Sequence, residues 1–136
     1  MKIKEIVAAY KALGEAKVNS LEESEILKIV KARKTMRSIA EEHDAFLKDC
    51  QEKFKPENFD EIQSKIQNWK DLSDEEKVEI NKILVEYQNK INSAILEEIE
   101  KEVDITIEKL NEDSITKLLK NNEWSANKVD ELSIMV

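Results

Sequence analysis

The sequence predicts a mainly α protein, a bundle of long antiparallel helices with a small two-stranded β ribbon at one end and short C-terminal helices. Three observations predict this fold. Glycine and proline occur once each among 136 residues, charged residues make up 38% of the chain, and apolar residues recur at helical spacing almost throughout. Only one stretch alternates apolar and polar residues like a strand. The length suits a single helical domain over residues 1–136.

The first two helices are predicted from apolar spacing and end signals. Apolar residues at three- and four-residue intervals place the first helix at residues 3–13, with Gly14 as a left-handed end. Ser20 and Glu23 have the spacing of a capping box that begins a long second helix. Pro56 ends that helix near residue 54 or 55. Its heptad seam comprises Ile26, Ile29, Arg33, Met36, Ala40, His43, Leu47, Cys50 and Phe54.

Four further helices are expected in the rest of the chain. Asn58 is placed to cap a short third helix, and Ser73 with Glu76 forms a second capping box that opens a long fourth helix ending near residue 102. Two short helices should begin with serine caps at Ser114 and Ser125.

The alternating stretch at residues 103–110 predicts the strand. A lone strand cannot pair its own backbone groups, so it needs an edge to join. The connection between the first two helices, around Val18, is the preferred edge, and the alternative is a second molecule. The proposed strand edge comprises Val103, Asp104, Ile105, Thr106 and Ile107, with Val103, Ile105 and Ile107 facing inward.

Composition excludes several classes of function. A net charge of −8 and a pI near 4.9 oppose binding to nucleic acid or anionic membrane. One cysteine excludes an intrachain disulfide, and no apolar run approaches the roughly 20 residues of a membrane span. We therefore expect a cytoplasmic protein.

Motifs for catalysis, cofactors or metals are absent from the sequence. His43 and Cys50 lie seven residues apart on the heptad seam, about 10 Å along a helix axis, which is too far for a catalytic couple. A metal site needs three or four ligands, and one histidine with one cysteine does not specify them. There is no glycine-rich phosphate loop. We expect no enzyme activity, no cofactor, no metal and no small-molecule substrate.

One basic cluster stands out in the acidic chain. It comprises Lys28, Lys31, Arg33, Lys34 and Arg37. The cluster could bind phosphate or an acidic partner, or could form ion pairs with neighbouring helices, which is the more usual role of such a run. Arg33 falls on the heptad seam and, if buried, would need a carboxylate partner. Trp124 is a second candidate contact for a partner, because tryptophan is enriched at interfaces.

The opening "MKIKEIVAAYKALGEAKVNSLEESEILKIVKARKTM", the helical middle and the late "EKEVDITIEKLNEDSI" resemble a family of small uncharacterised proteins encoded by tailed phages and prophages. The resemblance is in layout and covers most of the chain, with residues 56–78 as an added segment. It implies a non-enzymatic accessory or assembly role through a protein partner or self-association, in the cytoplasm of a host cell or, for a structural component of the phage, in the virion. The alternative is a regulatory module that binds nucleic acid or an acidic partner through residues 28–37.

Overall fold

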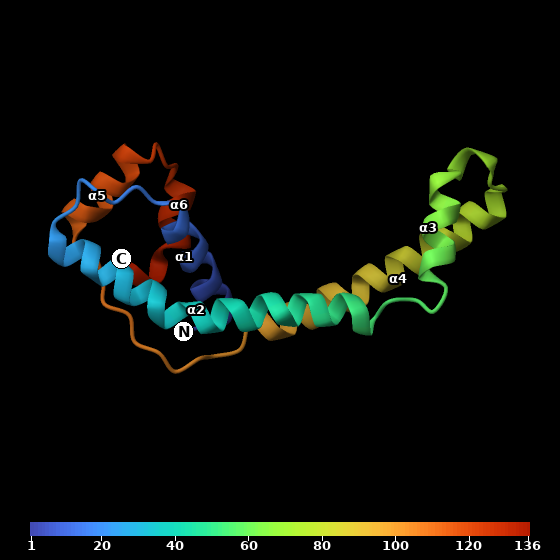
Figure 1. Ribbon diagram of the computed structural model, residues 1–136, viewed down its shortest axis with the longest axis horizontal. Coiled ribbons are helices and arrows are strands. Elements are labelled where there is room, and N and C mark those ends of the chain that lie inside the picture. Colours follow the sequence, from blue (N-terminus) through green and yellow to red (C-terminus); the bar gives the residue numbers. More distant parts are fainter. The chain divides into compact units, whose positions relative to one another are not determined.

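The fold is mainly helical. The computed structural model describes all 136 residues (Figure 1). Six α-helices and two short 3-10 helices make up the regular structure, and no β-strand is present. Their bounds are α1 Ile3–Glu15, α2 Glu23–Lys53, α3 Phe59–Gln67, η1 Trp69–Asp71, α4 Asp74–Ile99, α5 Glu112–Asn121, α6 Ala126–Glu131 and η2 Ser133–Met135.

The chain divides into two units, and each has its own buried residues. The first unit consists of Met1–Ala45 and Ile99–Val136, so it is built from two separate stretches of sequence. The second unit is the continuous stretch Phe46–Glu98. The helix α2 begins in the first unit and ends in the second.

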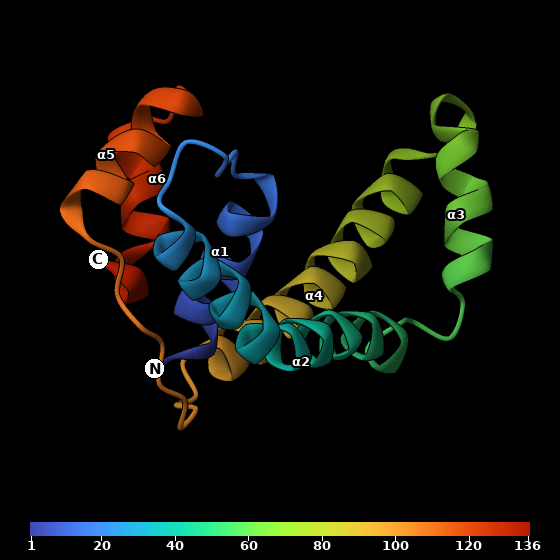
Figure 2. The same cartoon turned by 60° about the vertical axis from the view of Figure 1, so that its left-hand side comes forward.

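The core of the first unit joins its N-terminal and C-terminal stretches. Helix α1 lies beside α6 and η2 (Figures 1 and 2). Small residues on α1 allow close packing, and aliphatic side chains from the other elements fill the remaining space. The buried cluster comprises Ile6, Ala9, Ala12, Leu13, Leu21, Ile29, Ala32, Met36, Ile107, Leu110, Leu118, Leu132, Ile134 and Met135.

The predicted left-handed end at Gly14 is wrong. Helix α1 continues to Glu15, and no glycine has a positive φ. Gly14 instead gives room to the side chain of Arg33, since a Cβ at Gly14 would lie 3.3 Å from Arg33 Nη2. The glycine therefore serves a close approach between helices and not a change of backbone direction.

One predicted capping box is absent and the other position does cap a helix. Helix α2 begins at Glu23, and the Ser20 hydroxyl accepts a hydrogen bond from the side chain of Asn121 instead. At the start of α4, the Glu76 amide donates to Ser73 Oγ at 3.2 Å. Ser73 is thus confirmed as an N-cap.

The predicted two-stranded β ribbon is also wrong. The segment after α4 makes one isolated antiparallel bridge, between Lys2 and Glu102. Beside it, the Val103 amide donates to the Met1 carbonyl at 2.7 Å. The Ile105 amide then turns back to the carbonyl of Val103, at 3.2 Å. Because this amide bonds within its own segment, the bridge does not extend into a ladder.

Val18 is not the partner of this segment. The backbone of its neighbour Lys17 is bonded by a side chain: Lys17 N–H donates to Asn122 Oδ1 at 2.7 Å, and Asn122 Nδ2 donates to the Lys17 carbonyl at 3.2 Å. The amide side chain thus occupies both groups that a pairing strand would use at Lys17. Val18 packs half-buried against the core.

The inward and outward sets of residues 103–108 are as predicted, although the strand is absent. Val103 and Ile105 are half-buried, Ile107 is buried, and Asp104, Thr106 and Glu108 are exposed. An extended chain places alternate side chains on opposite sides whether or not it pairs. The segment therefore packs its apolar side chains on the core and leaves its polar side chains in solvent.

The second unit contains the end of α2 together with α3 and α4. Its most buried side chains are Cys50, Ile62, Ile80 and Ile91. Tyr87 fixes α4 to α2, because its hydroxyl donates to the Gln51 carbonyl at 2.8 Å. None of the helices in either unit combines the length and the apolar character needed to cross a membrane.

Candidate functional site

The five residues of the basic cluster lie on the first part of α2, and they have different surroundings. Lys28 is a structural residue. Its ammonium lies 2.8 Å from Glu25 Oε2 and donates to the Lys109 carbonyl at 3.2 Å. It therefore connects α2 to the segment that leads into α5, and it is not free to bind a partner.

Glu25 is a buried carboxylate that the sequence reasoning missed. It is 1% exposed, and its Oε1 accepts hydrogen bonds from the Asn111 amide at 2.7 Å and the Ser114 hydroxyl at 3.1 Å. The hydrogen bond from Lys28, followed by the Asn111 amide, holds the pKa of Glu25 below its ordinary value despite the opposing effect of burial. The only signal of its burial in the sequence is its position four residues before Ile29, because that spacing places both residues on the same side of α2.

Arg33 is also structural. Its guanidinium lies over the ring of Tyr10, with Cζ 4.7 Å from the ring centroid, and passes close to Gly14. The side chain is half-buried, and no carboxylate lies within ion-pair distance, so an aromatic ring takes the place of the expected carboxylate partner. Arg33 thus joins α2 to α1.

Three basic residues remain exposed and make no ion pair: Lys31, Lys34 and Arg37. They share one face of α2 with two aliphatic side chains, Leu27 and Val30, which are 51% and 55% exposed. We call these five residues the docking face. The opposite side of α2 supplies Ile29 and Met36 to the core, so the docking face has no partner within the first unit.

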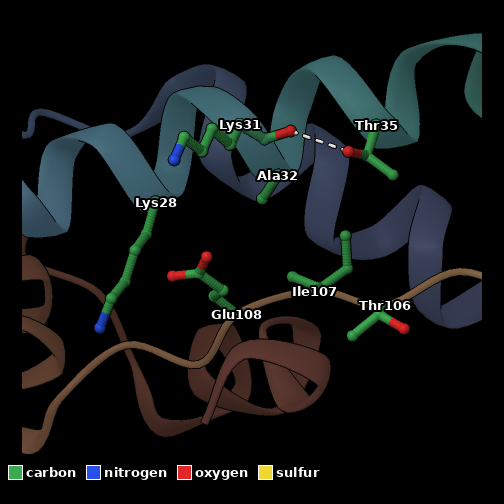
Figure 3. A pocket seen from close by; sticks show the side chains of 7 residues that line it. All are labelled: Lys28, Lys31, Ala32, Thr35, Thr106, Ile107 and Glu108. Carbon is green, nitrogen blue, oxygen red and sulfur yellow. Dashed lines mark hydrogen bonds between the residues drawn. The ribbon is translucent and has the colours of Figure 1, made fainter.

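A shallow cavity adjoins the docking face. Its volume is about 200 Å³, and it lies between α2 and residues 106–108 of the extended segment (Figure 3). Lys31 lines it from α2, while Glu108 and Thr106 line it from the segment. Because Figure 3 shows the Glu108 carboxylate directed toward α2, the cavity offers a negative charge beside the cations and does not suit an anion.

Trp124, the second candidate contact for a partner, belongs to the first unit. It is half-buried against the core of the first unit, and the Lys128 ammonium lies 6.0 Å from its ring centroid. Lys128 in turn forms ion pairs with Glu15 and Glu131, at 3.2 Å each. Glu123, with a φ of 54°, turns the chain so that the Trp124 amide donates to the Leu119 carbonyl at 3.0 Å.

His43 and Cys50 are both buried on α2. No group of three or more His, Cys, Asp or Glu side chains is arranged to hold a metal ion. The side chains that contact α2 pack in the core or form ion pairs. The docking face is a part of α2 that stays exposed.

Comparison with known proteins returns no family model, curated protein or solved structure that matches the chain.

Proposed function

We propose that this is a non-enzymatic interaction protein that binds an acidic protein partner through the docking face of α2. The observation that carries the proposal is the exposure of Leu27 and Val30 among three cations that make no ion pair. Two adjacent aliphatic side chains, each more than half exposed, stand out because Ile29 on the same helix is buried.

The two kinds of side chain have different roles in this binding. Burial of apolar surface supplies affinity, at roughly 25 cal/mol per Å². The ammonium and guanidinium groups of Lys31, Lys34 and Arg37 select partners with carboxylates and speed the encounter. The partner surface that fits best is therefore a helix that carries aliphatic residues flanked by Asp or Glu.

A protein partner is favoured over nucleic acid. Grooves that bind single strands usually add aromatic side chains on which bases stack, and the docking face has none. The chain's net charge of −8 also opposes approach to a polyanion. Nucleic acid is the alternative that the experiment below distinguishes.

The accessory or assembly role in a phage or prophage is part of the proposal on the strength of the resemblance in layout. Capsid, tail or lysis genes beside this gene would support it. Neighbouring genes for ordinary cellular metabolism would oppose it. The binding role of the docking face would then depend only on the crosslinking experiment.

Photo-crosslinking in the producing cell tests the docking face. A photo-reactive phenylalanine analogue replaces Val30, and in the control it replaces Thr116, an exposed residue of α5. We expect a protein adduct at position 30 and none at position 116. Mass spectrometry of the adduct should identify an acidic, aliphatic segment.

The charge requirement is tested with Lys31→Glu and Lys34→Glu combined in the same background. These exposed residues make no ion pair, so the variant should keep the helical circular dichroism and the melting temperature of the parent. Loss of the adduct would support the proposal. An adduct with nucleic acid only, or one that survives the charge reversal, would overturn it.

A further inference from the structure

We infer that the second unit holds a separate binding site for an aromatic phosphate, of the size and chemistry of a nucleoside monophosphate. The site is a cavity of about 310 Å³ where α2 ends and the chain turns toward α3. That volume is at the lower end of the range usual for small-ligand pockets. All the residues that line it belong to the second unit, Phe46–Glu98. The site is therefore separate from the docking face, which belongs to the first unit.

Three cations without ion pairs give the site its preference for an anion. Lys53 lines the cavity from the last residue of α2, Lys55 from the turn that follows, and Lys90 from α4. None of the three has a carboxylate within ion-pair distance, although Glu57 and Glu86 also line the cavity. Lysine is a compact point charge that suits a phosphate.

Two of the three cations lie over aromatic rings. The Lys53 ammonium lies 5.4 Å from the centroid of the Phe54 ring, and the Lys55 ammonium lies 5.0 Å from that of Phe59. Phe54 is half-buried and borders a second hollow of about 400 Å³ along α4. A flat ring beside a phosphate could therefore stack on Phe54 while the lysines hold the charge.

The wall of the cavity is already fixed. Tyr87 lines it, its hydroxyl is bonded to the Gln51 carbonyl at 2.8 Å, and its ring packs on Phe59 with centroids 5.7 Å apart. Pro56 restricts the turn that carries Lys55. A ligand would thus meet a formed surface, which reduces the entropy lost on binding.

The sequence contains a signal for this site in "KFKP" at residues 53–56, where basic and aromatic residues alternate. The lone glycine rules out a glycine-rich phosphate loop, in which backbone amides hold the phosphate. Here lysine side chains would take that role, and helix α4 brings Lys90 to them from 35 residues further along the sequence.

Titration of the full chain, labelled with ¹⁵N, tests the inference. Adenosine monophosphate, inorganic phosphate and adenosine are added separately in low salt. We expect shift changes at residues 53–57 and 83–90, with the nucleotide bound at least tenfold more tightly than phosphate or adenosine. Absence of binding, equal affinity for phosphate alone, or shifts elsewhere would overturn the proposal.

Matched variants identify the groups that bind. Lys90→Gln should weaken binding of the nucleotide at least fivefold, whereas Lys82→Gln, an exposed lysine of α4 outside the cavity, should change it less than twofold. Phe54→Leu should remove the advantage of the nucleotide over phosphate. Equal effects of Lys90→Gln and Lys82→Gln would overturn the site, as would an oligonucleotide that binds more tightly than the nucleotide by the same lysines.

Discussion

Glu25 Oε1 accepts a hydrogen bond from the Asn111 amide at 2.7 Å, across 86 residues of sequence. This bond fixes the start of α5 to α2, and the Ser114 hydroxyl adds a second bond to the same oxygen. A carboxylate at a helix N-terminus is favourable because free amides and the positive end of the helix dipole lie there. Glu25 thus acts as a cap supplied by a distant part of the chain.

Removal of this cap should destabilise the protein. Glu25→Ala leaves a part-buried amide and a buried hydroxyl without this partner, at a cost of about 1–3 kcal/mol in the free energy of unfolding. Urea unfolding followed by circular dichroism measures the change. The control is Glu23→Gln on the exposed side of the same helix, which should stay within about 0.5 kcal/mol of the parent. An equal, small effect of both substitutions would contradict the role assigned to Glu25.

Acid should weaken the ion pairs that join Glu100 to Lys2 and Lys4 within the first unit. Hydrogen bonds from Lys2 and then Lys4 lower the pKa of Glu100 from 4.5 to about 2. A pKa lowered in the folded state means that the carboxylate stabilises the fold above pH 4.5, and that this contribution disappears as the pH falls toward 2. The exposed position and the salt sensitivity of such pairs keep the contribution small.

The measurement is the urea midpoint at several pH values between 7 and 2. Glu100→Gln should lose less stability over the acidic range than the parent does, and 0.5 M NaCl should reduce the difference. Glu97→Gln, at an exposed carboxylate three residues earlier in α4, is the matched control and should follow the parent. An unchanged acid profile for Glu100→Gln would show that the two lysines do not stabilise the fold through Glu100.

Gly14 provides a test of the contact with Arg33. Gly14→Ala should raise the free energy of unfolding by about 0.5 kcal/mol, because alanine is the better helix former and the flexible guanidinium can yield to a Cβ at 3.3 Å. Gly14→Val should lower it, since a branched side chain displaces Arg33 from the ring of Tyr10. Thermal melts of both variants decide the matter, and a destabilised Gly14→Ala would mean that Arg33 cannot move.

Asn122 should be replaceable only by a residue that both donates and accepts. Its Oδ1 accepts from Lys17 N–H, and its Nδ2 donates to the carbonyls of Lys17 and Leu118. Asn122→Asp replaces the donating NH2 group with an oxygen that faces two carbonyl oxygens. We therefore expect the free energy of unfolding to fall by about 1 kcal/mol. Hydrogen exchange at the Lys17 amide measures the local opening. Asn127→Asp on exposed α6 is the control, and a comparable change there would refute the pairing.

The sequence was sufficient to predict a helical chain and the side of α2 that faces the core, but not every helix start, because Asn111 and not Ser114 caps α5. Apolar spacing and low glycine and proline content predict a helical chain, and the cap at Ser73 is a local signal that reads correctly. Ser20 failed because a local capping pattern competes with tertiary partners, here the side chain of Asn121.

The wrong prediction of the ribbon and the unforeseen intramolecular contacts of Lys28 and Arg33 share a cause. Alternation at residues 103–107 predicts an extended chain, but pairing depends on which backbone groups are free, and Asn122 occupies those of Lys17. In the same way, the charge run at residues 28–37 does not reveal that Lys28 and Arg33 have intramolecular partners. Those partners lie on other elements, so sequence spacing on α2 carries no information about them.

The discontinuous first unit has a consequence for synthesis of the chain on the ribosome. The ribosome makes the second unit, residues 46–98, before the C-terminal stretch that completes the first unit. Until that stretch is made, the apolar faces of α1 and of the start of α2 lack the residues that bury them. The closing contacts, such as that of Glu25 with Asn111, also bear the entropy cost of a long loop. We therefore expect the second unit to fold first. A nascent chain arrested near residue 100 would expose Ile6 and Met36 to chaperones and proteases.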